Sequence, residues 1–376
     1  MGRLHPTYSG PQPCIRPRAM RAAKPPAERL QINLFRVPFV SMEANLTADQ
    51  EVKVFRQVRA AYREGVALGV TREQLLSTVE TKYGELVAQY QPEKWQCPKV
   101  RFGRTELQMP IITLGGMRQQ QTWAPPDGMK VEDIGKECAD NFEAIVDRAM
   151  ELGINHFETA RGYGSSELQF GPVIKKYSRK AFILQTKVVP KEDAEEFRKS
   201  LETSFEKLQL EGDDAYIDLF AFHGINYPEQ LDWILKPGGC MEVAQEYKEK
   251  GKIKHIGFST HGMASTITAA IETGKFDYVN LHYHFIGSYT ASGTGALGGN
   301  LECILAAEKQ DMGVFIISAS DKGGKLYRPS KRFAANCKPL SPIGFHDNWL
   351  WTRENDGRQL IHTHTVGAAR SSDLDE

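Results

Sequence analysis

The sequence predicts an α/β protein built as a (β/α)8 TIM barrel, with a helical extension in front of the barrel. From Ile111 onward, short apolar runs typical of strands alternate with segments that have apolar residues at helical spacing. Alternation of this kind requires a parallel sheet with crossover helices, and about eight units favour a closed barrel over an open sheet. The first of these strands is not followed by GxGxxG, which counts against a dinucleotide-binding open sheet.

The individual elements follow from the positions of the apolar residues. Strands are expected at 102–107, 111–114, 154–157, 181–186, 216–222, 253–258, 278–283, 314–318 and 361–366. Helices are expected at 137–152, 194–208, 241–249, 266–272 and 301–310, and a further helix follows Glu167. Counted from Ile111, the strands number eight, and the barrel is expected to occupy 100–376 with an incomplete final helix.

Two segments precede the barrel. Residues 1–42 are rich in arginine and proline and contain one acidic residue, Glu28. This composition is typical of a chloroplast or mitochondrial transit peptide; a disordered leader, or translation that starts at Met42, explains it equally well. An intracellular location is expected in either case, in an organelle or in the cytoplasm.

Residues 43–99 are expected to form a helical extension and a linker. Apolar residues recur at helical spacing in two stretches, and Gly69 separates them. Thr71 and Gln74 have the spacing of a capping box at the start of the second helix. This helical hairpin is either a docking or lid module or a purely structural addition to the barrel.

Charge and composition narrow the classes of partner. Lys and Arg together number 47, as do Asp and Glu, so nothing favours nucleic acid as a partner. No run of about 18 apolar residues predicts a membrane-spanning helix. The 6 cysteines are scattered without a CxxC pair, and His282 and His284 have no evident third ligand. We therefore expect no metal site.

Four side chains that can hold or share protons follow three consecutive predicted strands. Glu158 ends one strand and Tyr163 lies in the turn behind it, while Lys187 and His223 end the next two strands. In a (β/α)8 barrel, the carboxyl ends of the strands surround one site. Such a group suits protonation of a carbonyl oxygen; the alternative is a polar network that plugs one end of the barrel.

The chemistry of these residues assigns them separate roles. Tyr163 can donate a proton, although an unperturbed phenol titrates near about 10. A nearby ammonium lowers that value, and Lys187 is the candidate. Glu158 can hold Lys187 in place, and His223 can orient the substrate oxygen.

Four segments together resemble the aldo-keto reductases. They are ETARGYG at 158–164, QTK at 185–187, DLFAFH at 218–223 and GKIKHIGFST at 251–260. Each motif is weak alone, but they occur in the family's order and each follows a predicted strand. The resemblance implies reduction of a small-molecule aldehyde or ketone with NADPH (cofactor NADP), with Glu158, Tyr163, Lys187 and His223 as catalytic residues.

The resemblance also implies cofactor contacts. They come from Ser259, Thr260, Asn280 and Ser318, and from Gly367, Arg370 and Ser371 in the turn after the last strand, where Arg370 would bind the 2′-phosphate. The chain departs from the family pattern at Glu158, where the family has aspartate, and at Ile317, which cannot stack on a nicotinamide as an aromatic residue does. These departures leave open a second interpretation, a catalytically weak nucleotide-binding barrel with a regulatory or interaction role.

Overall fold

The structure, a computed structural model, describes residues 48–89, 95–212, 214–285, 300–319, 326 and 328–375. The chain divides into two compact units, 1–93 and 94–376. The segment 1–42, expected to be a leader, lies outside the described residues. No described helix is both long enough and apolar enough to cross a bilayer.

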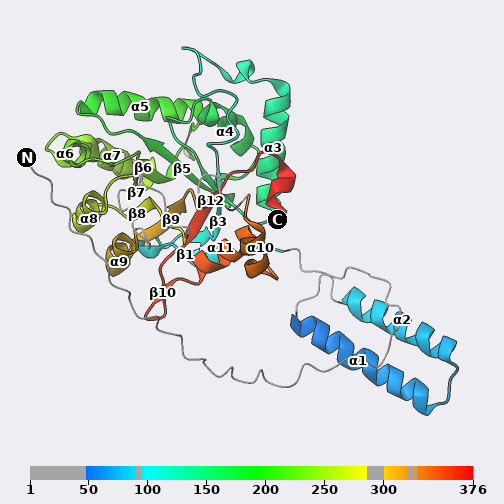
Figure 1. Ribbon diagram of the computed structural model, residues 1–376. Coiled ribbons are helices and arrows are strands. Elements are labelled where there is room, and N and C mark those ends of the chain that lie inside the picture. Colours follow the sequence, from blue (N-terminus) through cyan, green and yellow to red (C-terminus); the bar gives the residue numbers. More distant parts are fainter. Residues whose placement is uncertain are drawn as a thin grey trace, which may run out of the picture. The chain divides into compact units, whose positions relative to one another are not determined.

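The first unit contains the expected helical hairpin, formed by α1 (Ala48–Ala67) and α2 (Arg72–Gln89) (Figure 1). Gly69 ends the first helix in the left-handed conformation, at φ 68°. The predicted capping box is present: the Gln74 N–H donates to Thr71 Oγ1 at 3.3 Å, and the Thr71 N–H donates to Gln74 Oε1 at 3.0 Å. The buried contact between the helices involves Val58, Val79 and Leu86.

The second unit contains a closed barrel of parallel strands, as the sequence predicts. Neighbouring strands pair in the order β12-β3-β4-β5-β6-β7-β8-β9 (Figure 1). In chain order they are β3 (Ile112–Gly115), β4 (His156–Glu158), β5 (Ile183–Val188), β6 (Ile217–Phe222), β7 (Ile253–Ser259), β8 (Tyr278–His282), β9 (Gly313–Ile317) and β12 (Thr363–Val366). The predicted strands agree with these bounds to within a few residues.

Helices connect the strands and cover the outside of the barrel. They are α3 (Lys136–Glu151), α4 (Ser166–Ile174), α5 (Ala194–Lys207), α6 (Pro228–Leu235), α7 (Cys240–Glu249), α8 (Ala264–Glu272), α9 (Leu301–Lys309), α10 (Lys331–Cys337) and α11 (Pro342–Trp351). Short 3₁₀ helices lie at η1 (Gly103–Thr105), η2 (Val131–Asp133), η3 (Arg179–Ala181) and η5 (Ser371–Leu374). The elements α6, α10 and α11 were not predicted from the sequence. Nor was the small hairpin of β10 (Glu354–Asn355) and β11 (Arg358–Gln359).

The expected strand at 102–107 is wrong. The chain instead forms an antiparallel hairpin, β1 (Lys99–Arg101) and β2 (Gln108–Pro110), with η1 at its tip. Gly103 and Glu106 have φ values of 51° and 60°, which an extended strand does not permit. The Phe102 ring packs 5.7 Å from that of Tyr278, and the Arg104 N–H donates to the carbonyl of Asp311, before β9. The hairpin thus lies at the amino-terminal end of the barrel.

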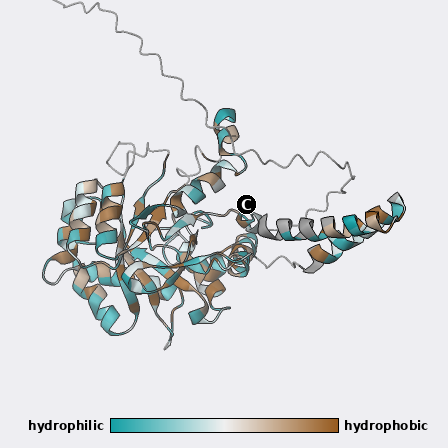
Figure 2. Ribbon diagram, turned by 90° about the horizontal axis from the view of Figure 1, so that it is seen from below, coloured by the Kyte–Doolittle hydropathy of each residue, from teal (hydrophilic) through white to brown (hydrophobic). Residues whose placement is uncertain are grey.

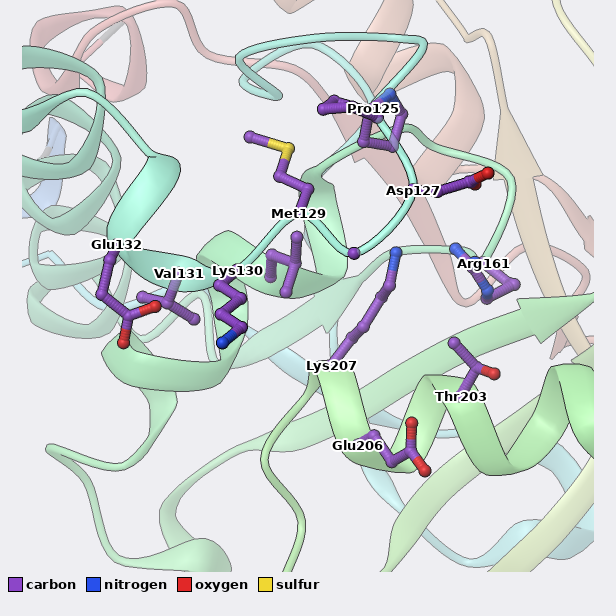
Figure 3. A pocket seen from close by; sticks show the side chains of 13 residues that line it. Pro125, Asp127, Met129, Lys130, Val131, Glu132, Arg161, Thr203, Glu206 and Lys207 are labelled. Atoms are coloured by element: carbon purple, nitrogen blue, oxygen red, sulfur yellow. The ribbon is translucent and has the colours of Figure 1, made fainter.

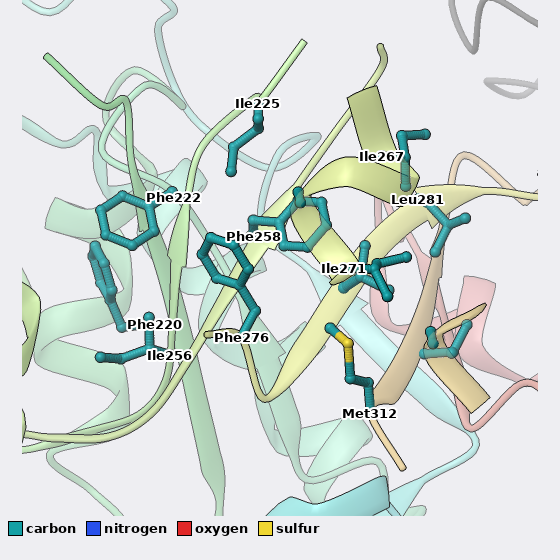
Figure 4. Packing of buried hydrophobic residues seen from close by; sticks show 14 of the residues in the cluster. Phe220, Phe222, Ile225, Ile256, Phe258, Ile267, Ile271, Phe276, Leu281 and Met312 are labelled. Carbon is teal, nitrogen blue, oxygen red and sulfur yellow. The ribbon is translucent and has the colours of Figure 1, made fainter. Parts of the chain in front are cut away.

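The hydrophobic core lies mainly between the barrel and its helices. Phe222, Phe258, Phe276 and Ile271 are fully buried in one cluster that links β6, β7 and β8 to α8 (Figure 4). The outer helices carry both hydrophilic and hydrophobic positions, as expected when one face packs on a barrel (Figure 2).

A smaller cluster fills the barrel interior. It contains Ile183, Leu219, Tyr278 and Phe315, each from a different strand. Because side chains alternate between the two faces of a strand, Ile183 inside the barrel places Lys187, four residues later, inside as well. Lys187 is thereby directed to the interior near the carboxyl end of β5.

Candidate active site at the carboxyl end of the barrel

The four predicted catalytic side chains lie together. Glu158 is the last residue of β4, Lys187 is the fifth residue of β5, and His223 directly follows β6. Parallel pairing aligns these ends, because Glu158 lies opposite Gln185, and Lys187 lies opposite Ala221. Tyr163 joins them from the turn between β4 and α4.

The turn that carries Tyr163 is clamped by the loop after β3. Gly164 has φ 56°, and a Cβ at this position would overlap the carbonyl oxygen of Thr122. The Ser165 N–H donates to the same carbonyl at 3.0 Å. Glycine is therefore required here for both conformation and space.

Glu158 and Lys187 form a buried ion pair. The Lys187 ammonium donates to Glu158 Oε1, and also to the carbonyl of Thr159 at 2.8 Å. Their side chains are 4% and 1% exposed, respectively. Burial lowers the pKa of Lys187 well below its ordinary value, and the adjacent carboxylate opposes this because it favours the ammonium form.

Tyr163 contacts the other three residues. Its hydroxyl donates to Glu158 Oε1 at 3.5 Å, and Lys187 Nζ lies 4.5 Å from the centre of its ring. The His223 ring packs edge-on against it, with centroids 5.5 Å apart. Glu158 Oε1 therefore lies between the ammonium and the phenol and serves both.

Burial raises the pKa of the Tyr163 phenol. This direction is opposite to the one expected from Lys187 alone, whose charge is paired with Glu158 in the structure. A phenol with a raised pKa stays protonated at neutral pH, so Tyr163 carries the proton that a donor needs.

His223 is held neutral. Burial lowers its pKa to about 3, with further contributions from the charges of Lys187 and His261. Its backbone N–H donates to the carbonyl of Val188 at 2.8 Å, but the buried Nδ1 has no hydrogen-bond partner within the described part of the chain. A neutral imidazole can donate one hydrogen bond to a carbonyl oxygen without adding charge.

Trp123 belongs to this site, although the sequence reading did not include it. It lies in the loop after β3, is 56% exposed, and packs edge-on against Tyr163 with centroids 6.5 Å apart. Its position in the sequence could have indicated this role: Trp123 lies in a proline-containing loop that follows a barrel strand, and such loops line the carboxyl end of the barrel.

Ser259 and Thr260, expected to bind the cofactor, also stabilise the turn after His223. The Gly224 N–H donates to Ser259 Oγ at 3.1 Å, and Thr260 Oγ1 donates to the carbonyl of Ile225 at 2.7 Å. These hydroxyls therefore hold together the ends of β6 and β7.

Asn280 is a buried amide whose side chain has no hydrogen-bond partner in the described part of the chain. It lies on β8, paired in register with Ser259 on one side and with Phe315 on the other. The side chain is fully buried, and neither Nδ2 nor Oδ1 has a hydrogen-bond partner among the described residues. Because nearly all buried polar groups are satisfied in folded proteins, this amide fits a site for an amide-bearing ligand such as a nicotinamide.

The turn after β12 contains a carboxylate, that of Asp373, which accepts hydrogen bonds from the turn itself. Arg370 Nε donates to Asp373 Oδ1 at 2.9 Å, and the N–H groups of Ala369 and Arg370 donate to Asp373 Oδ2 at 2.9 and 3.3 Å. The pair with Arg370 lowers the pKa of Asp373. One guanidinium donor of Arg370, the residue expected to bind a phosphate, is thus taken by a carboxylate, although the Arg370 side chain remains 75% exposed.

The remaining predicted residues frame this region. Ser318 follows β9 in the left-handed conformation, at φ 53°, and Ile317 packs against the interior cluster. Gly367 directly follows β12, and Ser371 begins η5. Among the described residues, no group of three or more His, Cys, Asp or Glu side chains is placed to hold a metal ion.

The chain resembles known proteins over the region that carries this site. The sequence model of the Aldo/keto reductase family matches residues 112–291. An L-galactose dehydrogenase of Arabidopsis thaliana is 33% identical over 135 residues, which are 34% of this chain and 40% of that protein. An NADH-specific methylglyoxal reductase of Escherichia coli is 25% identical over 210 residues, which are 50% of this chain and 59% of that protein.

The chain thus spans less than two thirds of the length of either curated relative. A solved structure with a similar fold is an aldo-keto reductase from Bacillus halodurans in its holo form. Its TM-score is 0.57, with 16% identity over 74% of this chain and 89% of that one. At this level of identity, the likeness concerns the fold alone.

Proposed function

Since this chain belongs to the aldo-keto reductase family, whose members are oxidoreductases, we propose that it reduces an aldehyde or ketone by hydride transfer from NADPH, with Tyr163 as the proton donor. The observation that carries the proposal is the convergence of Glu158, Tyr163, Lys187 and His223 at the ends of β4, β5 and β6. A network that only plugged the barrel would not require a turn that glycine and the loop after β3 hold in place so that it presents a phenol.

The proton step follows from the state of each group. When bound, NADPH would supply a hydride to the carbonyl carbon. Tyr163 gives its hydroxyl proton to the carbonyl oxygen, which yields the alcohol, and the phenolate then recovers a proton from water. The Lys187 ammonium, 4.5 Å from the ring centre, stabilises the phenolate while it exists.

His223 and Trp123 prepare the substrate. With its pKa lowered to about 3, the His223 imidazole is neutral across the physiological range and can donate to the carbonyl oxygen. Trp123 supplies an exposed aromatic wall beside Tyr163. Together they would hold the carbonyl within reach of the phenol, which is the positioning that such a step requires.

The cofactor proposal rests on Asn280 and Arg370. The partnerless amide of Asn280 would pair with the carboxamide of the nicotinamide, and Arg370 would pair with the 2′-phosphate as a fork donor. Asp373 is the observation that favours NADH as a second candidate, because its carboxylate accepts from Arg370 Nε and from the Ala369 N–H and repels a phosphate.

The names of the relatives suggest a substrate class. L-galactose and methylglyoxal are both small, polar compounds, and one relative is named for acting on each. We therefore propose a small polar aldehyde, or the corresponding hydroxyl compound in the reverse direction. Initial rates with methylglyoxal, L-galactose and simple aldehydes, each with NADPH or NADP as appropriate, test the class.

The second interpretation, a weakly catalytic nucleotide-binding barrel, is favoured by the contact between Glu158 and Tyr163. A carboxylate 3.5 Å from the phenol oxygen opposes formation of the phenolate. Quenching of protein fluorescence by NADPH, measured together with turnover of a reactive aldehyde, separates the two functions. Binding without turnover across a broad carbonyl panel would overturn the reductase.

A further inference from the structure

A pocket of about 570 Å³ lies beside the candidate active site. Its walls are the loop 125–132, Arg161 in the turn before Tyr163, Leu168 of α4, and the end of α5 at Thr203, Glu206 and Lys207 (Figure 3). Glu158, Tyr163, Lys187 and His223 are not among the residues that line it. The volume is in the range of pockets that hold small metabolites.

The inner charges of this pocket are both positive. Arg161 and Lys207 are half-buried, whereas the other charged lining residues are exposed. These are one base, Lys130, and three acids, Asp127, Glu132 and Glu206, so the rim of the pocket is net acidic. Figure 3 shows the Lys207 side chain extending from α5 toward the loop, with Arg161 nearby. Burial lowers the pKa of Lys207, and the charge of Arg161 lowers it further.

Neither cation has an acceptor among the residues that the structure describes. Within the described part of the chain, the side chains of Arg161 and Lys207 form no ion pair, and no hydrogen bond involves either guanidinium or ammonium. The buried Glu167 influences both electrostatically. One of its oxygens accepts from Thr186 Oγ1 at 2.7 Å, and the other has no hydrogen-bond partner among the described residues. Partial burial of two neighbouring cations costs solvation, and a bound anion would offset this cost.

We propose that this pocket binds a small anion, either a phosphate ester or a carboxylate, between Arg161 and Lys207. The site is separate from the proposed carbonyl and cofactor sites, so it stands whether or not the chain reduces carbonyls. The guanidinium offers a bidentate contact to either kind of anion, and the ammonium adds a point charge.

An anion in this position would be linked to the proton donor. The Arg161 N–H donates to the carbonyl of Lys187 at 2.9 Å, and the Tyr163 N–H donates to the carbonyl of Ala160 at 2.9 Å. The same short turn therefore carries both the pocket cation and the phenol. Occupancy would hold this turn in one conformation.

Isothermal titration calorimetry of the full chain tests the proposal. The probes are inorganic phosphate, glycerol 3-phosphate and succinate, which separate a phosphate from a carboxylate preference. The variants are Lys207→Gln and Arg161→Gln, and Lys199→Gln on the exposed face of α5 is the matched control. At least one probe should bind the wild type, and each pocket variant should weaken it by about tenfold or more, while the control should not change it.

Circular dichroism melting shows whether each variant is folded. Lys207 is at the end of α5, so its substitution carries the test if Arg161→Gln does not fold. Failure of all three probes to bind the folded wild type would overturn the site. Equal affinity in the wild type and Lys207→Gln would also overturn it, as would displacement of the anion by NADH or NADPH, which would put it in the cofactor site.

Discussion

Shortening Glu158 to aspartate should speed up carbonyl reduction. In the structure, Glu158 Oε1 lies 3.5 Å from the Tyr163 hydroxyl while it also binds Lys187. Removing one methylene withdraws the carboxylate by about 1.5 Å, to roughly 5 Å from the phenol oxygen. At an effective dielectric constant of about 20, repulsion between carboxylate and phenolate then falls from about 4.7 to about 3.3 kcal/mol.

The difference, about 1.4 kcal/mol, corresponds to roughly tenfold in rate. We therefore expect Glu158→Asp to raise kcat/KM for a small aldehyde by about tenfold and to lower the pKa of Tyr163. Initial rates measure the first effect, and ultraviolet titration of tyrosinate measures the second. The increase requires that Lys187 keep its position. We expect this because the contact of Lys187 with the Thr159 carbonyl does not involve the changed side chain.

The matched control is Glu196→Asp, the same substitution at an exposed position of α5, which should leave the rate unchanged. A fall in kcat/KM for Glu158→Asp with the fold intact would refute the reasoning. It would mean that the pocket depends on the longer acid and that the ion pair, rather than repulsion of the phenolate, controls the rate.

Four further outcomes are expected. Tyr163→Phe should remove proton donation and abolish turnover while NADPH binding, followed by fluorescence, stays near the wild-type value; normal turnover would exclude Tyr163. Arg370→Ala should weaken NADPH by roughly ten- to a hundredfold with little change for NADH, and Asp373→Asn should strengthen NADPH alone; equal losses of both cofactors in Arg370→Ala would exclude a 2′-phosphate contact. Burial lowers the pKa of both His156 and His223 to about 3, so the unfolded chain binds more protons than the folded chain below about pH 6.5. The free energy of unfolding should then fall as pH drops from about 6.5 toward 3, by about 1.4 kcal/mol per pH unit for each histidine. Urea unfolding of the wild type and of His156→Gln at several pH values measures this. A difference in free energy of unfolding between the two proteins that does not change with pH would contradict the prediction.

The barrel and the position of its site were predictable from the chain alone. Alternating apolar runs and helical spacing are local patterns, and the connection rules for parallel strands convert them into one closed sheet. Glu158, Lys187 and His223 lie at or next to the carboxyl ends of successive strands, so their convergence is a consequence of topology. The capping box at Thr71 and Gln74 was readable for the same reason, because its partners lie within one helical turn.

The expected strand at 102–107 does not form because contacts with distant residues determine the conformation of this segment. Phe102 is apolar and favours a strand by itself, yet the ring packs on Tyr278 and the backbone turns at Gly103 to pair with Asp311. Contacts this far apart in the chain outweigh a local preference of a fraction of a kcal/mol per residue.

Side-chain contacts within the site were likewise decided only by the tertiary structure. Residue types predicted that Lys187 would tune Tyr163, but Glu158 reaches both groups and burial raises the phenol pKa. The isolated amide of Asn280 depends on which neighbours the barrel leaves polar, and Arg161 meets Lys207 only because α5 packs beside the turn. A sequence determines which groups are available at a strand end, whereas distance, burial and competing partners determine their protonation and their free hydrogen bonds.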